Sequence, residues 1–209
     1  YRVIVPDLPG HAFTGDGGAR LLSIAGMARG VAERCAALET PPEVIVGHSA
    51  GTAVAVRGTV DGVFAPKLIV SINGAIIALR GVAAHLFSPM AKLMSFNWFM
   101  PWIFAARAGD DRMIDRLLDG TGSAIPPEGK ALYARLARSP RHVSAAFGMM
   151  ANWDLPGVER DLSRLAVPLL LVTGARDQMI APSQALEAAQ RAARAEVMTL
   201  GELGHLCHE

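Results

Sequence analysis

Short β-branched hydrophobic runs alternate with segments of helical spacing at both ends of the chain. Five such runs predict β-strands, at residues 1–5, 43–46, 67–72, 167–172 and 196–200. The fourth run is wholly apolar, which is typical of a parallel strand covered on both faces. This alternation predicts the α/β class, with a mostly parallel sheet flanked by helices.

Helical spacing of apolar residues predicts helices at residues 21–38 and 51–56. A further Ala-rich helix is expected to open near Ser183, with Pro182 in its first turn. Residues 80–162 have helical patterns and no convincing strand, so we expect a helical cap inserted into the sheet domain. The predicted segments are core residues 1–79, cap residues 80–162 and core residues 163–209.

Composition narrows the class of protein further. Apolar residues make up 51% of the chain, enough to fill a substantial core. The 20 basic residues nearly balance the 19 acidic ones, and a net charge of +1 offers no electrostatic footprint for nucleic acid. Cys35 and Cys207 have neither metal nor disulfide spacing, so a reducing, cytoplasmic location is expected. No uninterrupted apolar run reaches about 18 residues, so we do not expect a transmembrane helix.

The sequence Gly47-His48-Ser49-Ala50-Gly51 follows a predicted strand and precedes a predicted helix of small residues. Glycine-x-serine-x-glycine in this context is typical of a tight strand-to-helix turn that presents a nucleophilic serine. We expect Gly47 and Gly51 to permit close backbone approach, and the Ala50 N–H to stabilise an oxyanion from a helix N-terminus. Ser49 is therefore the candidate nucleophile, against the alternative of a structural Gly/Ser turn. His48 is expected to give packing or hydrogen-bonding support.

A serine nucleophile needs a base and an orienting carboxylate, which in this motif class follow in the order Ser, Asp, His. Asp177 and His205 each come directly after a predicted strand, at the sheet edge where parallel α/β active sites assemble. Asp177 could instead serve only as a turn former or helix cap. Asn73 follows another strand but cannot supply a negative charge, and His208 competes with His205 for the role of base.

Three motifs add a resemblance to known proteins: residues 6–11 (Pro-Asp-Leu-Pro-Gly-His), 85–93 (His-Leu-Phe-Ser-Pro-Met-Ala-Lys-Leu) and 149–155 (Met-Met-Ala-Asn-Trp-Asp-Leu). Together with the serine motif they make the whole chain resemble the α/β-hydrolase superfamily. The two cap motifs look like those of the magnesium-chelatase accessory proteins of bacteriochlorophyll biosynthesis (BchO type).

The resemblance implies an α/β-hydrolase fold with a helical cap and a triad of Ser49, Asp177 and His205. It implies a role in photosynthetic pigment synthesis, around the insertion of magnesium into protoporphyrin, with magnesium chelatase as a possible partner and no cofactor. It further implies that N-terminal strands, with the loop that carries the first oxyanion donor, and the last helix are absent from this fragment.

The predicted cap is rich in methionine and aromatic residues, which make adaptable apolar walls. One interpretation is a cap core packed on itself. The other is a pocket for an apolar or tetrapyrrole ligand, or a surface in peripheral contact with a membrane. The candidate pocket residues are His48, Met90, Met94, Trp98, Met150 and Trp153. No cluster of carboxylates or histidines has ligand spacing, so no metal site is expected.

Two functions stay open at this point. The first is a serine hydrolase that cleaves an ester-like or other acyl bond of a small apolar substrate through an acyl-enzyme. The second is a tetrapyrrole-binding accessory protein that uses the cap and needs no catalysis. An intact set of triad residues favours the first, and the methionine-rich and aromatic cap is what the second would need.

Overall fold

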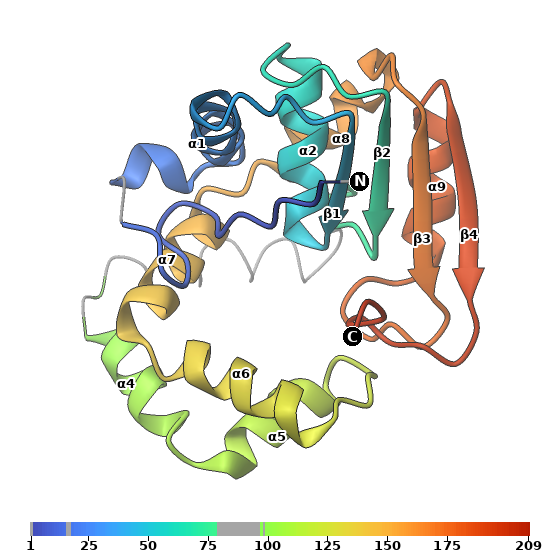
Figure 1. Ribbon diagram of the computed structural model, residues 1–209. Helices are drawn as coiled ribbons and strands as arrows, with labels where there is room; N and C mark the ends of the chain where they lie inside the picture. Colours follow the sequence, from blue (N-terminus) through green and yellow to red (C-terminus); the bar gives the residue numbers. More distant parts are fainter. Residues whose placement is uncertain (1, 16–17, 79–96, 98) are drawn as a thin grey trace.

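The computed structural model describes residues 2–15, 18–78, 97 and 99–209 of the chain. Within them a four-stranded parallel sheet has the order β1-β2-β3-β4, and all its arrows point the same way in Figure 1. The strands are β1 (Val44–His48), β2 (Leu68–Ile72), β3 (Leu169–Gly174) and β4 (Ala195–Leu200). Ile45 lies opposite Ile69, Ile69 opposite Leu169, and Leu169 opposite Ala195. The α/β class, the parallel sheet and its four later strands are confirmed.

The predicted strand at residues 1–5 is wrong for the part of it that the structure describes. Residues 2–7 have no regular secondary structure, and the side chains of Val3 and Val5 are 79% and 88% exposed. A strand needs a neighbour whose backbone groups complete its ladder. β1 forms the edge of the described sheet and pairs with β2 alone. The β-branched pattern of residues 2–5 therefore has no partner strand among the described residues.

Helices of the core pack on one face of the sheet. They are α1 (Ile24–Ala37), α2 (Ala50–Val60), α8 (Leu155–Asp161) and α9 (Ser183–Arg191), with the 3-10 turns η1 (Ala19–Leu22) and η2 (Leu162–Arg164). Their buried side chains form one cluster with Ile69, Leu169 and Leu171, which alternate along β2 and β3 toward that face. On the other face Leu170 and Val172 are only half-buried. Coverage of both faces of β3, expected from its apolar run, is thus incomplete within the described residues.

From residue 99 to α8 the chain consists of helices joined by turns and short irregular segments. Its helices are α4 (Met100–Arg107), α5 (Asp111–Asp119), α6 (Pro127–Ala137) and α7 (Pro140–Ala151). Figure 1 shows α4, α5 and α6 grouped beyond the end of the sheet to which the strand arrows point. We call the segment from α4 to α7 the cap. α8 comes within the predicted insertion by sequence but packs on α2, with Val158 in the main core cluster.

A second apolar cluster joins the cap to the C-terminal segment. Ile114 and Leu118 of α5 pack with Ile125 and with Ala134 of α6, and Leu206 enters the same cluster from beyond β4. Leu206 is only 8% exposed. The cap is therefore anchored to the segment that follows the last strand, the segment that also carries His205.

Candidate active site

Ser49 lies in the tight turn between β1 and α2, at the carboxyl end of the sheet. Its backbone has φ 48° and ψ −115°, a conformation that non-glycine residues rarely adopt. The Ser49 N–H donates to the Ile72 carbonyl at 2.9 Å, and the Ser49 carbonyl accepts from the Ala75 N–H at 3.0 Å. The end of β2 thus holds the strained turn in place. Ala50 is the first residue of α2, so its N–H is among those without an intrahelical acceptor.

The two glycines of the motif differ in what they do. A Cβ on Gly47 would lie 2.6 Å from the backbone nitrogen of Thr52, so the strand and helix can approach this closely only if residue 47 is glycine. A Cβ on Gly51 would meet no atom of the described structure within 4 Å. The prediction that both glycines permit close approach is therefore correct for Gly47 and wrong for Gly51. The tight contact of the turn is on its strand side.

Asp177 and His205 form a buried pair at the same end of the sheet. The distance from His205 Nδ1 to Asp177 Oδ2 is 2.8 Å, and the side chains are 9% and 0% exposed, respectively. Asp177 Oδ1 accepts from the backbone N–H groups of Met179 and Ile180 at 2.7 and 2.9 Å. A carboxylate can only accept, so Nδ1 of His205 carries the proton and Nε2 of a neutral imidazole keeps its lone pair. Asp177 thus fills both roles weighed from the sequence, turn former and histidine partner.

The competing residues take other positions. His208 packs against the ring of His48, with centroids 4.2 Å apart, and its Nε2 lies 3.8 Å from Glu209 Oε1. His205, not His208, therefore contacts Asp177.

The hydroxyl of Ser49 makes no hydrogen bond to His205 among the contacts of the described residues. Such catalytic contacts are often long until a substrate is bound, so the pairing of Ser49 with His205 belongs to the proposed mechanism.

His48 connects the nucleophile turn to the loop that carries His205. Its Nε2 donates to the His205 carbonyl oxygen at 2.9 Å, and the two imidazole centroids are 4.8 Å apart. Burial lowers the pKa of His48 to about 4, with the nearby imidazole of His208 acting in the same direction. The ring is therefore neutral near pH 7, as a donor at Nε2 alone. The expected hydrogen-bonding support by His48 is found, and its target is the backbone of His205.

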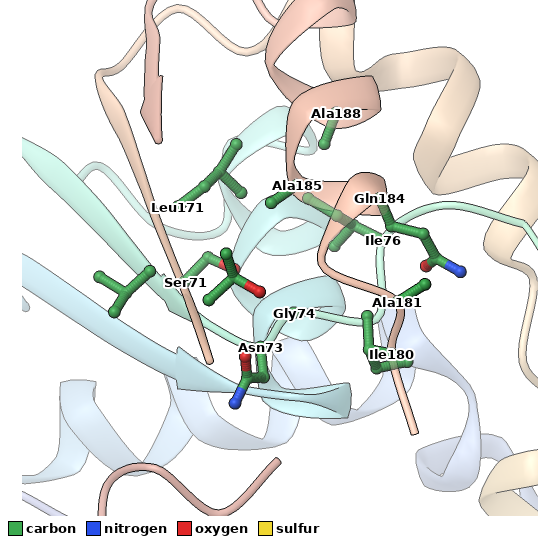
Figure 2. Close-up of a pocket in the computed structure, with 12 residues that line it drawn as sticks. Ser71, Asn73, Gly74, Ile76, Leu171, Ile180, Ala181, Gln184, Ala185 and Ala188 are labelled. Atoms are coloured by element: carbon green, nitrogen blue, oxygen red, sulfur yellow. The ribbon is translucent and has the colours of Figure 1, made fainter. Parts of the chain in front are cut away.

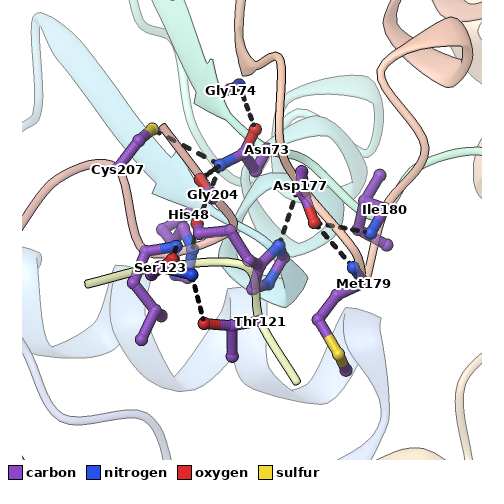
Figure 3. Close-up of polar contacts among 12 residues, drawn as sticks. His48, Asn73, Thr121, Ser123, Gly174, Asp177, Met179, Ile180, Gly204 and Cys207 are labelled. Atoms are coloured by element: carbon purple, nitrogen blue, oxygen red, sulfur yellow. Dashed lines mark hydrogen bonds and ion pairs between the residues drawn. The ribbon is translucent and has the colours of Figure 1, made fainter. Parts of the chain in front are cut away.

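Asn73 is the residue of this site whose role the sequence did not reveal. It follows β2 with φ 45° and is 2% exposed. Its Nδ2 donates to the carbonyl oxygens of Gly204 and His205 at 3.0 and 2.8 Å, and its Oδ1 accepts from the Gly174 N–H at 2.8 Å. Figure 3 shows Asn73 between Gly174, at the end of β3, and Gly204, in the loop of His205. The sequence offered one signal, an asparagine directly after a predicted strand, because asparagine tolerates positive φ better than most other residues.

The structure describes only some of the predicted pocket residues. Met90, Met94 and Trp98 lie outside the described residues. Met150 is half-buried on α7, whereas Trp153 packs against the main core cluster instead. The role of these residues in a ligand pocket stays a prediction.

A small cavity lies between the sheet and α9, as Figure 2 shows. Among its lining residues are Ser71, Asn73, Leu171 and Gln184, and its volume is about 10 Å³. That is room for roughly one water molecule and excludes an organic substrate. No donor of the described residues reaches the buried side-chain oxygen of Gln184, which fits a bound water. The predicted substrate pocket is not this cavity.

The described part of the chain has neither a cluster of metal-binding side chains nor a helix that could cross a membrane. No group of three or more histidine, cysteine, aspartate or glutamate side chains in the described ranges could hold a metal ion. Among the helices that the structure describes, none combines the length and the hydropathy needed to cross a bilayer.

Comparison with known proteins places this geometry in a family. The whole chain, residues 1–209, matches the model of the alpha/beta hydrolase family. It is also 34% identical over 209 residues to the "Magnesium-chelatase 30 kDa subunit" of Rhodobacter capsulatus, covering 100% of this chain and 72% of that protein. The resemblance inferred from the cap motifs is thereby confirmed.

Solved structures agree on the fold. An α/β-hydrolase-fold protein from Burkholderia ambifaria superposes with a TM-score of 0.75 at 18% identity, over 97% of this chain and 74% of that one. An esterase from Exiguobacterium antarcticum gives a TM-score of 0.71 at 15% identity, over 95% and 72% of the two chains. A fully matched family model, a strained serine turn and a buried acid–histidine pair lead to one assignment. The chain belongs to the α/β-hydrolase family.

Proposed function

We propose that the protein is a serine hydrolase that acts on a small apolar or tetrapyrrole-derived acyl substrate and works alongside magnesium chelatase. The observation that carries the proposal is the 2.8 Å hydrogen bond between His205 Nδ1 and Asp177 Oδ2. It lies at the same end of the sheet as the strained turn of Ser49. Support for the chelatase connection comes from the Rhodobacter capsulatus relative, whose name describes a chelatase subunit.

In the proposed reaction, Ser49 Oγ attacks the acyl carbon while His205 Nε2 removes the hydroxyl proton. The Ala50 N–H donates to the oxyanion that forms, from the N-terminus of α2. The tetrahedral intermediate then collapses, the bond to the leaving group breaks, and His205 protonates that group. Water attacks the acyl-enzyme with His205 as base, and the proton returns to Ser49 Oγ as the acid product leaves.

Asp177 has two tasks in this scheme. Its Oδ2 keeps the proton of His205 on Nδ1, so that Nε2 remains free to accept from the serine. Its negative charge stabilises the imidazolium that forms in each half-reaction. The backbone donors of Met179 and Ile180 fix the carboxylate while it does so.

A fluorophosphonate probe tests the hydrolase on the full-length natural protein. We expect covalent labelling of the wild type and none of Ser49→Ala. Asp177→Asn should label far more slowly, since loss of the orienting carboxylate costs about 10⁴ in rate in serine hydrolases. Ser163→Ala, at an exposed serine of η2, is the matched control and should label like the wild type. A wild type that stays unlabelled, or a Ser49→Ala variant that is labelled equally, contradicts the proposal.

The second candidate is a tetrapyrrole-binding accessory protein without catalysis. The observation that favours it is again the chelatase-subunit relative, whose name describes no hydrolysis. Titration of protoporphyrin and of its magnesium form, followed by fluorescence quenching, separates the candidates. Tight binding by an unlabelled wild type would replace the hydrolase with this function. Restoration of pigment by Ser49→Ala in a pigment-deficient strain would show that the cell needs binding rather than acyl chemistry.

A further inference from the structure

The loop that carries His205 leaves the sheet after Leu200 and is held on its N–H side by the cap. The His205 N–H donates to the Thr121 carbonyl oxygen at 2.9 Å, and the Leu206 N–H donates to Ser123 Oγ at 2.9 Å. Thr121 and Ser123 belong to the turn between α5 and α6. Two successive backbone donors of the candidate base loop therefore end on one turn of the cap (Figure 3).

The same turn also touches the loop of the acid. The Thr121 carbonyl accepts a second, longer hydrogen bond of 3.5 Å from the Gln178 N–H, next to Asp177. Gly122, with φ 73°, lies so close to the Arg176 carbonyl that a side chain would collide with it. We call residues 121–123 the cap turn. It bridges the Asp177 loop and the His205 loop, which reach the site from different strands.

Packing on the histidine side reinforces this bridge. A Cβ on Gly204 would collide with the backbone of Gly122, so the two glycines bring the loops into direct backbone contact. Leu206 is buried in the apolar cluster of α5 and α6. The hydroxyl of Tyr133 on α6 adds a hydrogen bond of 2.7 Å to Glu209 Oε1. The cap and the base loop thus share a hydrophobic core and a set of hydrogen bonds.

The carbonyl side of His205 is held by the core instead, through Asn73 and His48. The peptide groups of His205 are therefore clamped between the cap on one side and the sheet on the other. A movement of α5 and α6 relative to the sheet would therefore act on the backbone of His205, because that backbone is bonded to both.

We propose that the cap turn positions His205 against Asp177, with Ser123 as its positioning side chain, so that the cap sets the rate of the chemical step as well as the binding of substrate. This inference rests on the proposed hydrolase for the chemical role of His205. The placement of the imidazole that it asserts can be measured without any reaction. A cap that only covered substrate would change KM, whereas this cap also changes kcat.

Two variants of the full-length protein at Ser123, with one control variant at Ser139, test the role of Ser123. Ser123→Val removes the hydroxyl that accepts the Leu206 N–H. Ser123→Thr keeps that hydroxyl on a side chain with the same shape as valine. Ser139→Ala is the matched control, because Ser139 Oγ also accepts a backbone N–H in the cap, that of His142, away from the triad loops. Urea denaturation establishes which variants are folded.

The first measurement is the labelling rate with the fluorophosphonate probe as a function of pH. We expect Ser123→Val to label about tenfold more slowly than the wild type, since misplacement of a catalytic group by a fraction of an ångström costs rate of this order. The midpoint of its pH profile should shift, because that midpoint reports the acid–base pair. Ser123→Thr and Ser139→Ala should keep the rate and the midpoint of the wild type.

The second measurement is the proton resonance of His205 Nδ1–H, whose downfield position reports its hydrogen bond to Asp177. We expect it to move upfield or broaden in Ser123→Val only. If the wild type is not labelled at Ser49, the proposed hydrolase fails, and the resonance alone decides the inference. Equal labelling and equal resonances in Ser123→Val and Ser123→Thr would overturn it, as would a changed resonance with unchanged labelling of an active enzyme.

Discussion

Replacing Asn73 by alanine should remove the three hydrogen bonds that tie β2 to the Gly174 N–H and to the carbonyls of Gly204 and His205. Asn73 is 2% exposed, so bulk water does not reach these groups. A buried hydrogen bond contributes about 1 kcal/mol net, and a buried group left without a partner costs about 1–3 kcal/mol. Alanine also suits φ 45° less well than asparagine, by about 1 kcal/mol. We expect Asn73→Ala to lower the free energy of unfolding by about 4 kcal/mol.

Two further substitutions separate the contributions. Asn73→Gly removes the same bonds but accepts the positive φ, so it should be about 1 kcal/mol more stable than Asn73→Ala. Asn73→Asp keeps the shape and the acceptor for Gly174, but it turns an oxygen toward the carbonyls of Gly204 and His205. A buried carboxylate facing two acceptors should destabilise by at least as much as alanine does.

Urea denaturation of the full-length protein measures these changes, and the labelling rate with a fluorophosphonate probe reports their effect on the site. A loss of less than about 1 kcal/mol in Asn73→Ala, or wild-type stability of Asn73→Asp, would refute the assignment of Asn73 as the tether of the His205 loop. Unchanged labelling of a stable Asn73→Ala variant would show that the tether supports the fold without affecting His205.

Gly47→Ala should lower the free energy of unfolding by about 2 kcal/mol or more, because its Cβ would lie 2.6 Å from Thr52 N. Gly51→Ala on α2 should be neutral or slightly stabilising. Equal unfolding midpoints of the two variants in urea would contradict this difference. Burial keeps the pKa of His48 near 4 in the folded protein, against 6.5 when unfolded, so the unfolded state binds more protons below pH 6.5. The contribution of neutral His48 to stability is therefore complete above pH 6.5 and is lost by up to about 3 kcal/mol as the pH falls toward 4. His48→Gln should remove that part of the loss in thermal unfolding at pH 7 and pH 4.5, and an unchanged pH dependence would exclude His48 as its source.

Hydrophobic patterns and turn residues in the sequence were sufficient to predict the four strands of the described sheet and the turn that carries Ser49. The strands at β1 to β4 were predicted because each is a short β-branched or apolar run bounded by turn residues, and all four pair with one another. The serine motif was sufficient to place Ser49 at a strained strand-to-helix turn. In such a turn the strand and the helix approach so closely that residue 47 has no room for a side chain. The order Ser, Asp, His then selected Asp177 and His205, which the structure brings into contact.

Patterns failed where the outcome depends on a neighbour distant in sequence. Residues 2–5 have strand composition but no adjacent strand among the described residues. Gly51 has the expected spacing, yet the space around it is open in the described structure. Asn73 was weighed as a possible acid and set aside because an amide has no negative charge. Its actual role, donating to a loop more than 130 residues later, depends on a partner that no local pattern shows. Helical and strand periodicities contain no information about such partners.

The contacts missed by sequence reasoning explain how a histidine outside any regular element is fixed. His205 comes after β4 in a turn segment, where backbone entropy favours many positions. Its N–H is bound by the cap turn and its carbonyl by Asn73 and His48, while its ring is bound by Asp177. Each bond alone is weak compared with the cost of ordering the loop, but together they act on the two peptide groups of one residue and on its ring. The backbone of His205 is thus bonded to the cap as well as to the sheet, and this double attachment is the physical basis for the proposed role of the cap turn.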